Sequence, residues 1–179
     1  MLYFLALIPP KPLKDQIHKM KLGFKEHFNS AHSLKAPPHI TLLSPFRLNA
    51  DDKEELEITL KKFSQDFKPF DVQLKNFSHF ESRVIFIDVK KEPTLINLQL
   101  QLEKVARSNP HLFNYNYDER PYHPHLTLAF KDLTAENFKR AWDEFRKQTF
   151  DASFFANSIY LLKHNGNKWE VDREFVLGG

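Results

Sequence analysis

The stretch PHITL at residues 38–42 recurs as PHLTL at residues 124–128, and this repeat decides the fold that the sequence predicts. His125 follows His39 by 86 residues, close to half of the 179-residue chain. The predicted elements repeat as well, because each half reads strand, helix, strand, helix, strand. A duplicated lobe explains this pattern, whereas a solenoid would repeat a much shorter unit.

Hydrophobic periodicity predicts the individual elements. Residues 108–122 are expected to form a long loop, and Asn165-Gly166 predicts a hairpin turn between the last two strands. We expect one domain over residues 1–179, with pseudo-repeat lobes of approximately 1–82 and 83–179. Strands are predicted at residues 2–8, 39–46, 70–77, 83–89, 125–130, 150–162 and 169–177, and helices at 12–28, 51–67, 93–107 and 134–145.

The composition excludes several kinds of site. Without cysteine, the chain has no disulfide, thiolate metal site or cysteine nucleophile. Its 4 glycines form no glycine-rich loop that could hold a dinucleotide or a nucleoside triphosphate. The net charge of +3, from 26 basic and 23 acidic residues, favours a small anion over a long nucleic-acid track.

Nothing in the sequence predicts membrane attachment or export. The first ten residues, MLYFLALIPP, lack a basic start and are broken by Pro9-Pro10, so they predict a strand rather than a signal peptide. No apolar run approaches the roughly 20 residues of a membrane helix. We therefore expect a cytoplasmic monomer that does not bind membranes.

The repeated motif has the groups needed for phosphodiester chemistry. Residues i and i+2 of a strand share a face, so His39 projects with Thr41, and His125 with Thr127. In-line displacement at phosphorus needs a base on one side and an acid on the other, and histidine can serve as either. Threonine hydroxyls can donate to the phosphate oxygens. No metal or cofactor is required.

On these residues the chain resembles the 2H phosphoesterase superfamily, in its bacterial branch of 2′-5′ RNA ligases and cyclic phosphodiesterases. The hallmark of that family is two His-x-Thr/Ser motifs about half a chain apart, each followed by an apolar residue. The resemblance implies an α+β fold, bilobal and duplicated, in which two antiparallel sheets form a concave cleft with helices on the outside. It also implies an enzyme whose catalytic residues are His39, Thr41, His125 and Thr127.

The expected function is therefore that of a metal-independent phosphodiesterase. Its substrates would be 2′,3′-cyclic phosphates or 2′-5′ linked RNA and nucleotides, with RNA ends or small cyclic nucleotide phosphates as partners. The reverse reaction would make it a 2′-5′ RNA ligase. Two alternatives stay open at this stage: a non-catalytic RNA- or nucleotide-binding module with the same cleft, and a metal-dependent hydrolase that uses His123 and His125.

Further residues near the motifs are candidates for substrate contact. Many relatives carry an arginine after the second motif, where this chain has Ala129-Phe130-Lys131. Two cations share the strand face of a motif if each strand continues far enough, and aromatic side chains near the cleft can stack on a base. For each of these, a solvated charge or ordinary packing is the alternative. The candidates are Arg47, Lys131, Tyr122, His123, His79 and Phe80.

Overall fold

A computed structural model describes residues 1–114 and 121–179 of the chain. Part of the predicted loop 108–122 therefore lies outside the described residues. The described elements, in chain order, are β1 (Leu2–Leu7), α1 (Leu13–Phe28), the 3₁₀ turn η1 (His32–Lys35), β2 (Ile40–Arg47), α2 (Lys53–Gln65), β3 (Phe70–Phe80), β4 (Val84–Val89), α3 (Pro93–Ser108), β5 (His125–Ala129), α4 (Ala135–Phe145), β6 (Asp151–Ala156), β7 (Ser158–His164) and β8 (Trp169–Val176).

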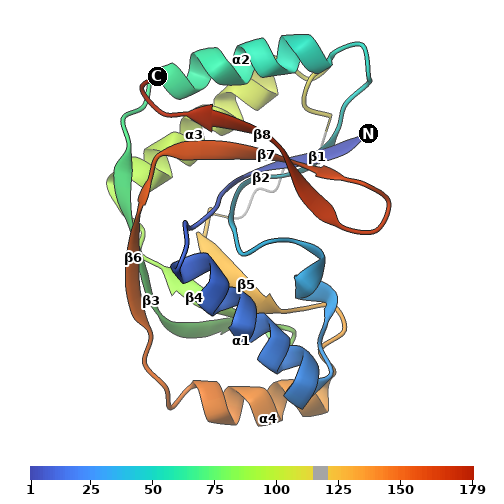
Figure 1. The fold of residues 1–179 in the computed structure, drawn as a ribbon, viewed down its shortest axis with the longest axis vertical. Coiled ribbons are helices and arrows are strands. Elements are labelled where there is room, and N and C mark those ends of the chain that lie inside the picture. Colours follow the sequence, from blue (N-terminus) through green and yellow to red (C-terminus); the bar gives the residue numbers. More distant parts are fainter. Residues whose placement is uncertain (115–120) are drawn as a thin grey trace.

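The strands form two four-stranded antiparallel sheets. The first has the order β2-β1-β7-β8 and the second the order β5-β4-β3-β6. In each sheet a motif strand lies at one edge, β2 in the first and β5 in the second, and its neighbour is β1 or β4 (Figure 1). The predicted α+β fold with two antiparallel sheets is confirmed.

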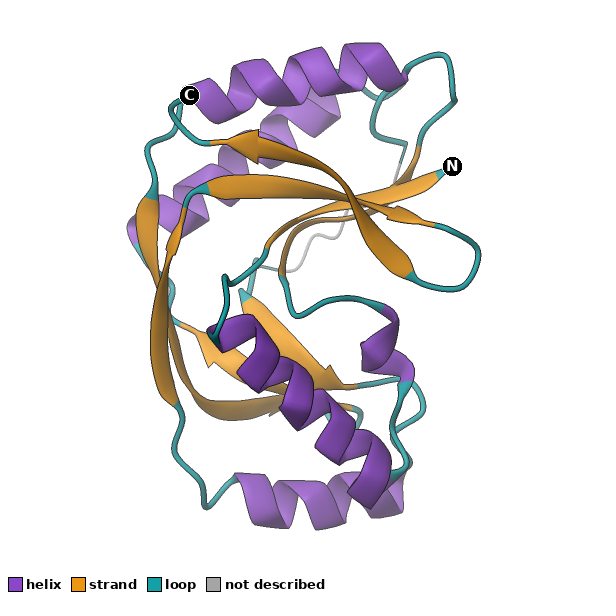
Figure 2. Cartoon of the chain, viewed as in Figure 1, coloured by secondary structure: helices purple, strands orange, loops and turns teal. Residues whose placement is uncertain are grey.

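The helices cover the outer faces of the two sheets. α2 and α3 pack on the first sheet, whereas α1 and α4 pack on the second. In the view of Figure 2, α2 and α3 lie together above the first sheet and α4 lies at the bottom, while α1 runs diagonally in front of the second sheet. Across residues 1–114 and 121–179, no helix combines the length and the apolar character needed to cross a membrane.

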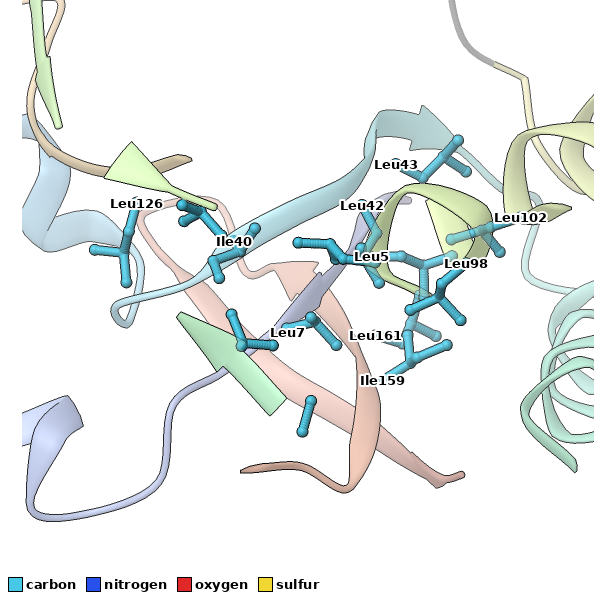
Figure 3. Packing of buried hydrophobic residues seen from close by; sticks show 14 of the residues in the cluster. Leu5, Leu7, Ile40, Leu42, Leu43, Leu98, Leu102, Leu126, Ile159 and Leu161 are labelled. Atoms are coloured by element: carbon cyan, nitrogen blue, oxygen red, sulfur yellow. The ribbon is translucent and has the colours of Figure 1, made fainter. Parts of the chain in front are cut away.

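Strand alternation builds the core between each sheet and its helices. Leu5 of β1 and Leu161 of β7 are fully buried and paired, on the face that packs toward Leu98 and Leu102 of α3 (Figure 3). The motif strands contribute their apolar residues to the same cluster, to which Leu126 belongs. Anchoring of this kind fixes which face of each motif strand carries its polar residues.

One sequence prediction needs correction. The single strand predicted at 150–162 is two strands that break at Asn157 and belong to different sheets, because β6 pairs with β3 and β7 with β1. The lobes 1–82 and 83–179 stay a prediction, and each sheet takes strands from both of these halves of the chain. β3 joins the second sheet, while β7 and β8 complete the first. Periodicity within a segment carries no information on which distant strand it pairs with.

Candidate active site

The first motif lies at the start of β2, beside β1. Ile40 pairs with Leu7, and Thr41 pairs with Ala6. Because paired residues share a face and successive residues alternate, Ile40 and Thr41 point to opposite faces of the sheet. Ile40 is fully buried in the core, whereas His39 and Thr41 are half-buried. The apolar residue thus anchors the motif, and the polar residues face away from α3.

The second motif repeats this arrangement on β5. Leu126 pairs with Ile87 of β4, and both are fully buried. Thr127 pairs with Phe86, and His125 pairs with Asp88. The imidazole and the hydroxyl of this motif therefore share the face of β4 that carries Phe86 and Asp88.

The two motifs come together between the sheets. β2 contacts β5, and His125 is close enough to His39 to lower the pKa of His39 when charged. No side chain in the described ranges forms a hydrogen bond with the hydroxyl of Thr41 or Thr127. The contact between the two strands thus brings the two imidazoles near each other, and in the described ranges both threonine hydroxyls are left without a protein partner.

The same backbone hydrogen bond orients both imidazoles. His39 Nδ1 donates to the carbonyl of Pro37 at 2.7 Å, and His125 Nδ1 donates to the carbonyl of His123 at 2.7 Å. A carbonyl can only accept, so Nδ1 carries the proton in each ring. Each neutral ring therefore keeps Nε2 as the basic nitrogen, and no other described residue bonds to it.

Aromatic rings support each imidazole from the neighbouring central strand. The ring of Phe4 on β1 lies 4.8 Å from that of His39, and the ring of Phe86 on β4 lies 5.1 Å from that of His125. Phe80 of β3 lies over Phe86 at 4.3 Å and meets His125 edge-on at 4.9 Å. In both sheets the imidazole thus packs on a phenylalanine of the neighbouring strand, which limits rotation of the ring.

Burial sets the charge of both histidines. Loss of solvent is the main cause that lowers the pKa of His39 to about 3; Lys21 lowers it further and the bond to Pro37 opposes the shift. Burial also lowers the pKa of His125, against the hydrogen bond to His123 and the charge of Asp88, which raise it. The site without ligand therefore holds neutral imidazoles at neutral pH. Among the described residues, a carboxylate, that of Asp88, raises the pKa of His125, whereas none acts on His39.

Asp88 is a site residue that the sequence analysis missed. Its Oδ1 accepts a hydrogen bond from His123 Nε2 at 2.9 Å, and its backbone pairs with His125. The sequence feature that could have revealed Asp88 is its position as a single acid among otherwise apolar residues in the strand segment 84–89. In the part of the chain that the structure describes, no three histidine, aspartate or glutamate side chains gather closely enough to hold a metal ion.

Three candidate contact residues lie beside the motifs. His123 bonds to Asp88, and its ring centre is 6.4 Å from that of His125. Phe80 meets both of these rings. Tyr122 donates its hydroxyl to the carbonyl of Thr41 at 2.8 Å, and burial raises the pKa of this phenol. Tyr122 thus links the segment before the second motif to the first motif.

The other three candidates lie elsewhere. The ring of His79 packs against Trp142 of α4 at 4.7 Å. Arg47 pairs with Leu2 at the far end of β1, about 20 Å along the strand from Thr41 at roughly 3.3 Å per residue. Lys131 follows the end of β5 with a left-handed φ of 63°, so it does not share the strand face of the second motif. The structure does not bring these side chains to the two imidazoles.

Asp132 ties the segment before the first motif to the end of the second motif strand. Its carboxylate accepts hydrogen bonds from Ser30 Oγ, from the backbone N–H of Ala31 and from that of His32, each at 2.8 Å. Burial alone would raise the pKa of Asp132, but these bonds outweigh it and lower the pKa. The tie restrains one motif relative to the other, although they are far apart in sequence.

Replacing Asp132 with alanine should cost about 1–3 kcal/mol of unfolding free energy at pH 7, because it removes three charge-assisted bonds from a partly exposed carboxylate. The folded-state pKa of Asp132 is lowered, so its contribution is present above the unfolded pKa and is lost as pH falls through the folded value. Urea denaturation at pH 7 and near pH 3 measures this. Asp71→Ala, at an exposed acid of β3, is the control and should change stability little at either pH.

Two antiparallel sheets that bring together a pair of His-x-Thr motifs define a phosphoesterase of the two-histidine class. The comparison with family models agrees: the model of the 2′-5′ RNA ligase superfamily matches residues 9–168. The chain belongs to this superfamily.

Curated relatives of similar length carry the same class of name. "Putative phosphoesterase OB1230" of Oceanobacillus iheyensis is 26% identical over 182 residues, with 99% of each chain covered. A protein of Staphylococcus haemolyticus named in the same way is 28% identical, with 97% of each chain covered. The likeness thus spans both motifs and the whole fold.

Solved structures show the same fold at lower identity. TT0787 of Thermus thermophilus superposes with a TM-score of 0.69 at 17% identity, covering 100% of this chain and 99% of that one. LigT of Escherichia coli, solved in complex with 3′-AMP, superposes with a TM-score of 0.60 at 19% identity, covering 98% and 97%. These matches place the two-sheet arrangement in a known fold.

Proposed function

We propose that this protein is a metal-independent phosphodiesterase that acts on 2′,3′-cyclic phosphates or on 2′-5′ linked RNA and nucleotides. The observation that carries the proposal is the matched pair of backbone hydrogen bonds from His39 Nδ1 and His125 Nδ1. They leave both Nε2 atoms for proton transfer, beside the two threonine hydroxyls that can donate to a phosphate. The LigT structure with 3′-AMP supports a nucleotide as ligand.

The different surroundings of the two histidines support different roles for them in the proposed reaction. His39 has a cation nearby, which opposes its protonation, so it serves as the base. His125 has Asp88 nearby, which favours the protonated form, so it serves as the acid. In hydrolysis, water attacks phosphorus as His39 Nε2 takes its proton, and the P–O bond to the ribose oxygen breaks as His125 Nε2–H protonates that oxygen. A ribose hydroxyl in place of water gives the ligation that reverses cleavage.

The aromatic ring of Phe80 suits the base of the nucleotide. It lies against His123 and His125 and is only partly buried. Aromatic side chains stack on bases of any sequence. The proposed substrate therefore has its phosphate between the motifs and a base near Phe80 and His123.

The test is a screen of purified protein against 2′,3′-cyclic nucleotides, oligonucleotides with cyclic ends and 2′-5′ linked dinucleotides, each with and without saturating EDTA. Turnover that EDTA leaves unchanged supports the proposal. Activity that collapses with EDTA and returns with zinc or manganese would favour a metal-dependent hydrolase. Tight binding of these ligands without product would favour a binding module.

The rate should follow a bell-shaped pH profile with its optimum below pH 6.5. The base must be neutral, so kcat/KM falls as pH drops through the His39 pKa of about 3. The acid must be protonated, so kcat/KM falls as pH rises through the His125 pKa, which lies below 6.5. Asp88→Asn should move the alkaline limb to lower pH, because it removes the charge that favours protonated His125. An alkaline limb above pH 8, or one unmoved in Asp88→Asn, would contradict the role of His125.

A further inference from the structure

Lys21 occupies a position on α1 that the helix pattern reserves for an apolar side chain. The buried stripe of this helix is Ile17, Lys21, Phe24 and Phe28, and Lys21 is only 2% exposed. Fully buried lysines are rare unless they are paired with an acid. Burial lowers the pKa of Lys21 to about 7, and no carboxylate in the described ranges pairs with it. A buried ammonium without a counterion is costly, so its retention needs an explanation.

The contacts of Lys21 lead to the first motif. Its Nζ donates to the carbonyls of Ser33 at 3.0 Å and Ala36 at 3.2 Å. The next carbonyl, that of Pro37, accepts the bond that orients the His39 ring. Lys21 therefore holds the backbone on which His39 depends.

The same segment also touches the second motif strand. Ser33 Oγ donates to the carbonyl of Leu128 at 2.6 Å, so the residue whose own carbonyl binds Lys21 is fixed to β5. α1 itself packs against both β5 and η1. Lys21 thus lies where the segment before the first motif contacts β5, the strand of the second motif.

The charges around this point are mostly positive or neutral. Lys21 of α1 and His125 of β5 both lower the pKa of His39, while β1 contributes the uncharged ring of Phe4. η1 adds two more basic residues, His32 and Lys35. The acid next to this segment, Asp132, is engaged by Ser30 and by two backbone N–H groups.

We propose that Lys21 is a positioning residue of the candidate site, whose ammonium orients the His39 segment and supplies the buried positive charge that an anionic phosphate balances. The inference rests on the proposed function, because it assigns Lys21 to the phosphate end of the same site. A bound anion stabilises the charged form of Lys21, so the site takes up a proton as the anion binds. The same charge adds to burial, the main cause, in opposing protonation of His39.

Sulfate is the probe, since its charge stays constant from pH 7 to 9, where both motif histidines are already neutral. If sulfate raises the pKa of Lys21 by about 1 unit, affinity in the wild-type protein falls roughly fivefold between pH 7 and pH 9. In Lys21→Met, which keeps an unbranched side chain as far as Cε and loses the ammonium, affinity is weaker at pH 7 and does not vary over this range. Lys19→Met, at an exposed lysine of the same helix, behaves as the wild type. The α-amino group of Met1 donates to the carbonyl of Leu48 at 2.8 Å, away from the motifs.

The second readout is the titration of the His39 ring, followed by NMR without substrate. In Lys21→Met the pKa of His39 rises by about 1 unit, because a repelling charge is gone, and the acidic limb of kcat/KM moves with it. A purely structural lysine would lower activity without moving either titration. Sulfate affinity that is flat from pH 7 to 9 in the wild-type protein overturns the proposal even if Lys21→Met does not fold. Neither binding nor NMR depends on turnover, so failure of the proposed function is seen separately in the substrate screen.

Discussion

Replacing His39 or His125 with alanine is expected to lower kcat/KM for a 2′,3′-cyclic nucleotide by roughly 10²–10⁴-fold, the usual contribution of a general acid or base. Each proton transfer has one suitably oriented Nε2, because both rings are fixed through Nδ1. The double variant should be little worse than either single one, since groups that act as a unit are not additive. Steady-state kinetics on the four proteins, corrected for folded fraction, measures this.

His18→Ala is the matched control, because His18 is exposed on α1 and away from both motifs. It should keep full activity. The two site variants should stay folded, with a small loss of stability in His39→Ala from its packing on Phe4. Full activity in His39→Ala, or a double variant whose loss is the product of the two single losses, would contradict the paired mechanism.

The motif residues could be predicted from the sequence because strand alternation is a local property. An apolar residue after each histidine places His39 with Thr41, and His125 with Thr127, on the opposite face from the core. The duplication then pairs the two copies. The start of the helix at Thr134 could be predicted for the same reason, because the Thr134 side chain accepts a hydrogen bond from the N–H of Asn137, only three residues further along the chain.

The remainder of the site depends on contacts between distant parts of the chain. The sheet order could not be predicted, because β1 and β7 pair across more than 150 residues of sequence. Asp88 and Lys21 carry no motif of their own and matter only through the elements that bury them beside the histidines. The sequence offered Lys131 and Arg47 as candidate strand-face cations, with a solvated charge as the alternative. β5 ends at Ala129 before Lys131, and Arg47 lies at the other end of β2 from the first motif.

Thr127→Val should lower kcat/KM by roughly 10²–10³-fold, and Thr41→Val should do the same, since each removes one donor to the charge that develops on phosphate. Valine keeps the branched shape of threonine, so the strands should pack unchanged. The hydrogen bond from the Tyr122 hydroxyl to the Thr41 carbonyl does not involve the side-chain hydroxyl of Thr41, so Thr41→Val leaves it intact.

Thr127→Ser and Thr41→Ser are the matched controls, because they keep the hydroxyl and lose only a methyl group. Each should stay within about tenfold of the wild-type rate, and most of the loss in the valine variants should appear in kcat, because the donors bind the transition state more strongly than the substrate. Equal rates for the valine and serine variants at either position would show that the hydroxyl does not stabilise phosphate. A loss confined to KM would instead assign the two threonines to ground-state binding and leave charge stabilisation to other groups, with the buried ammonium of Lys21 as the first to test.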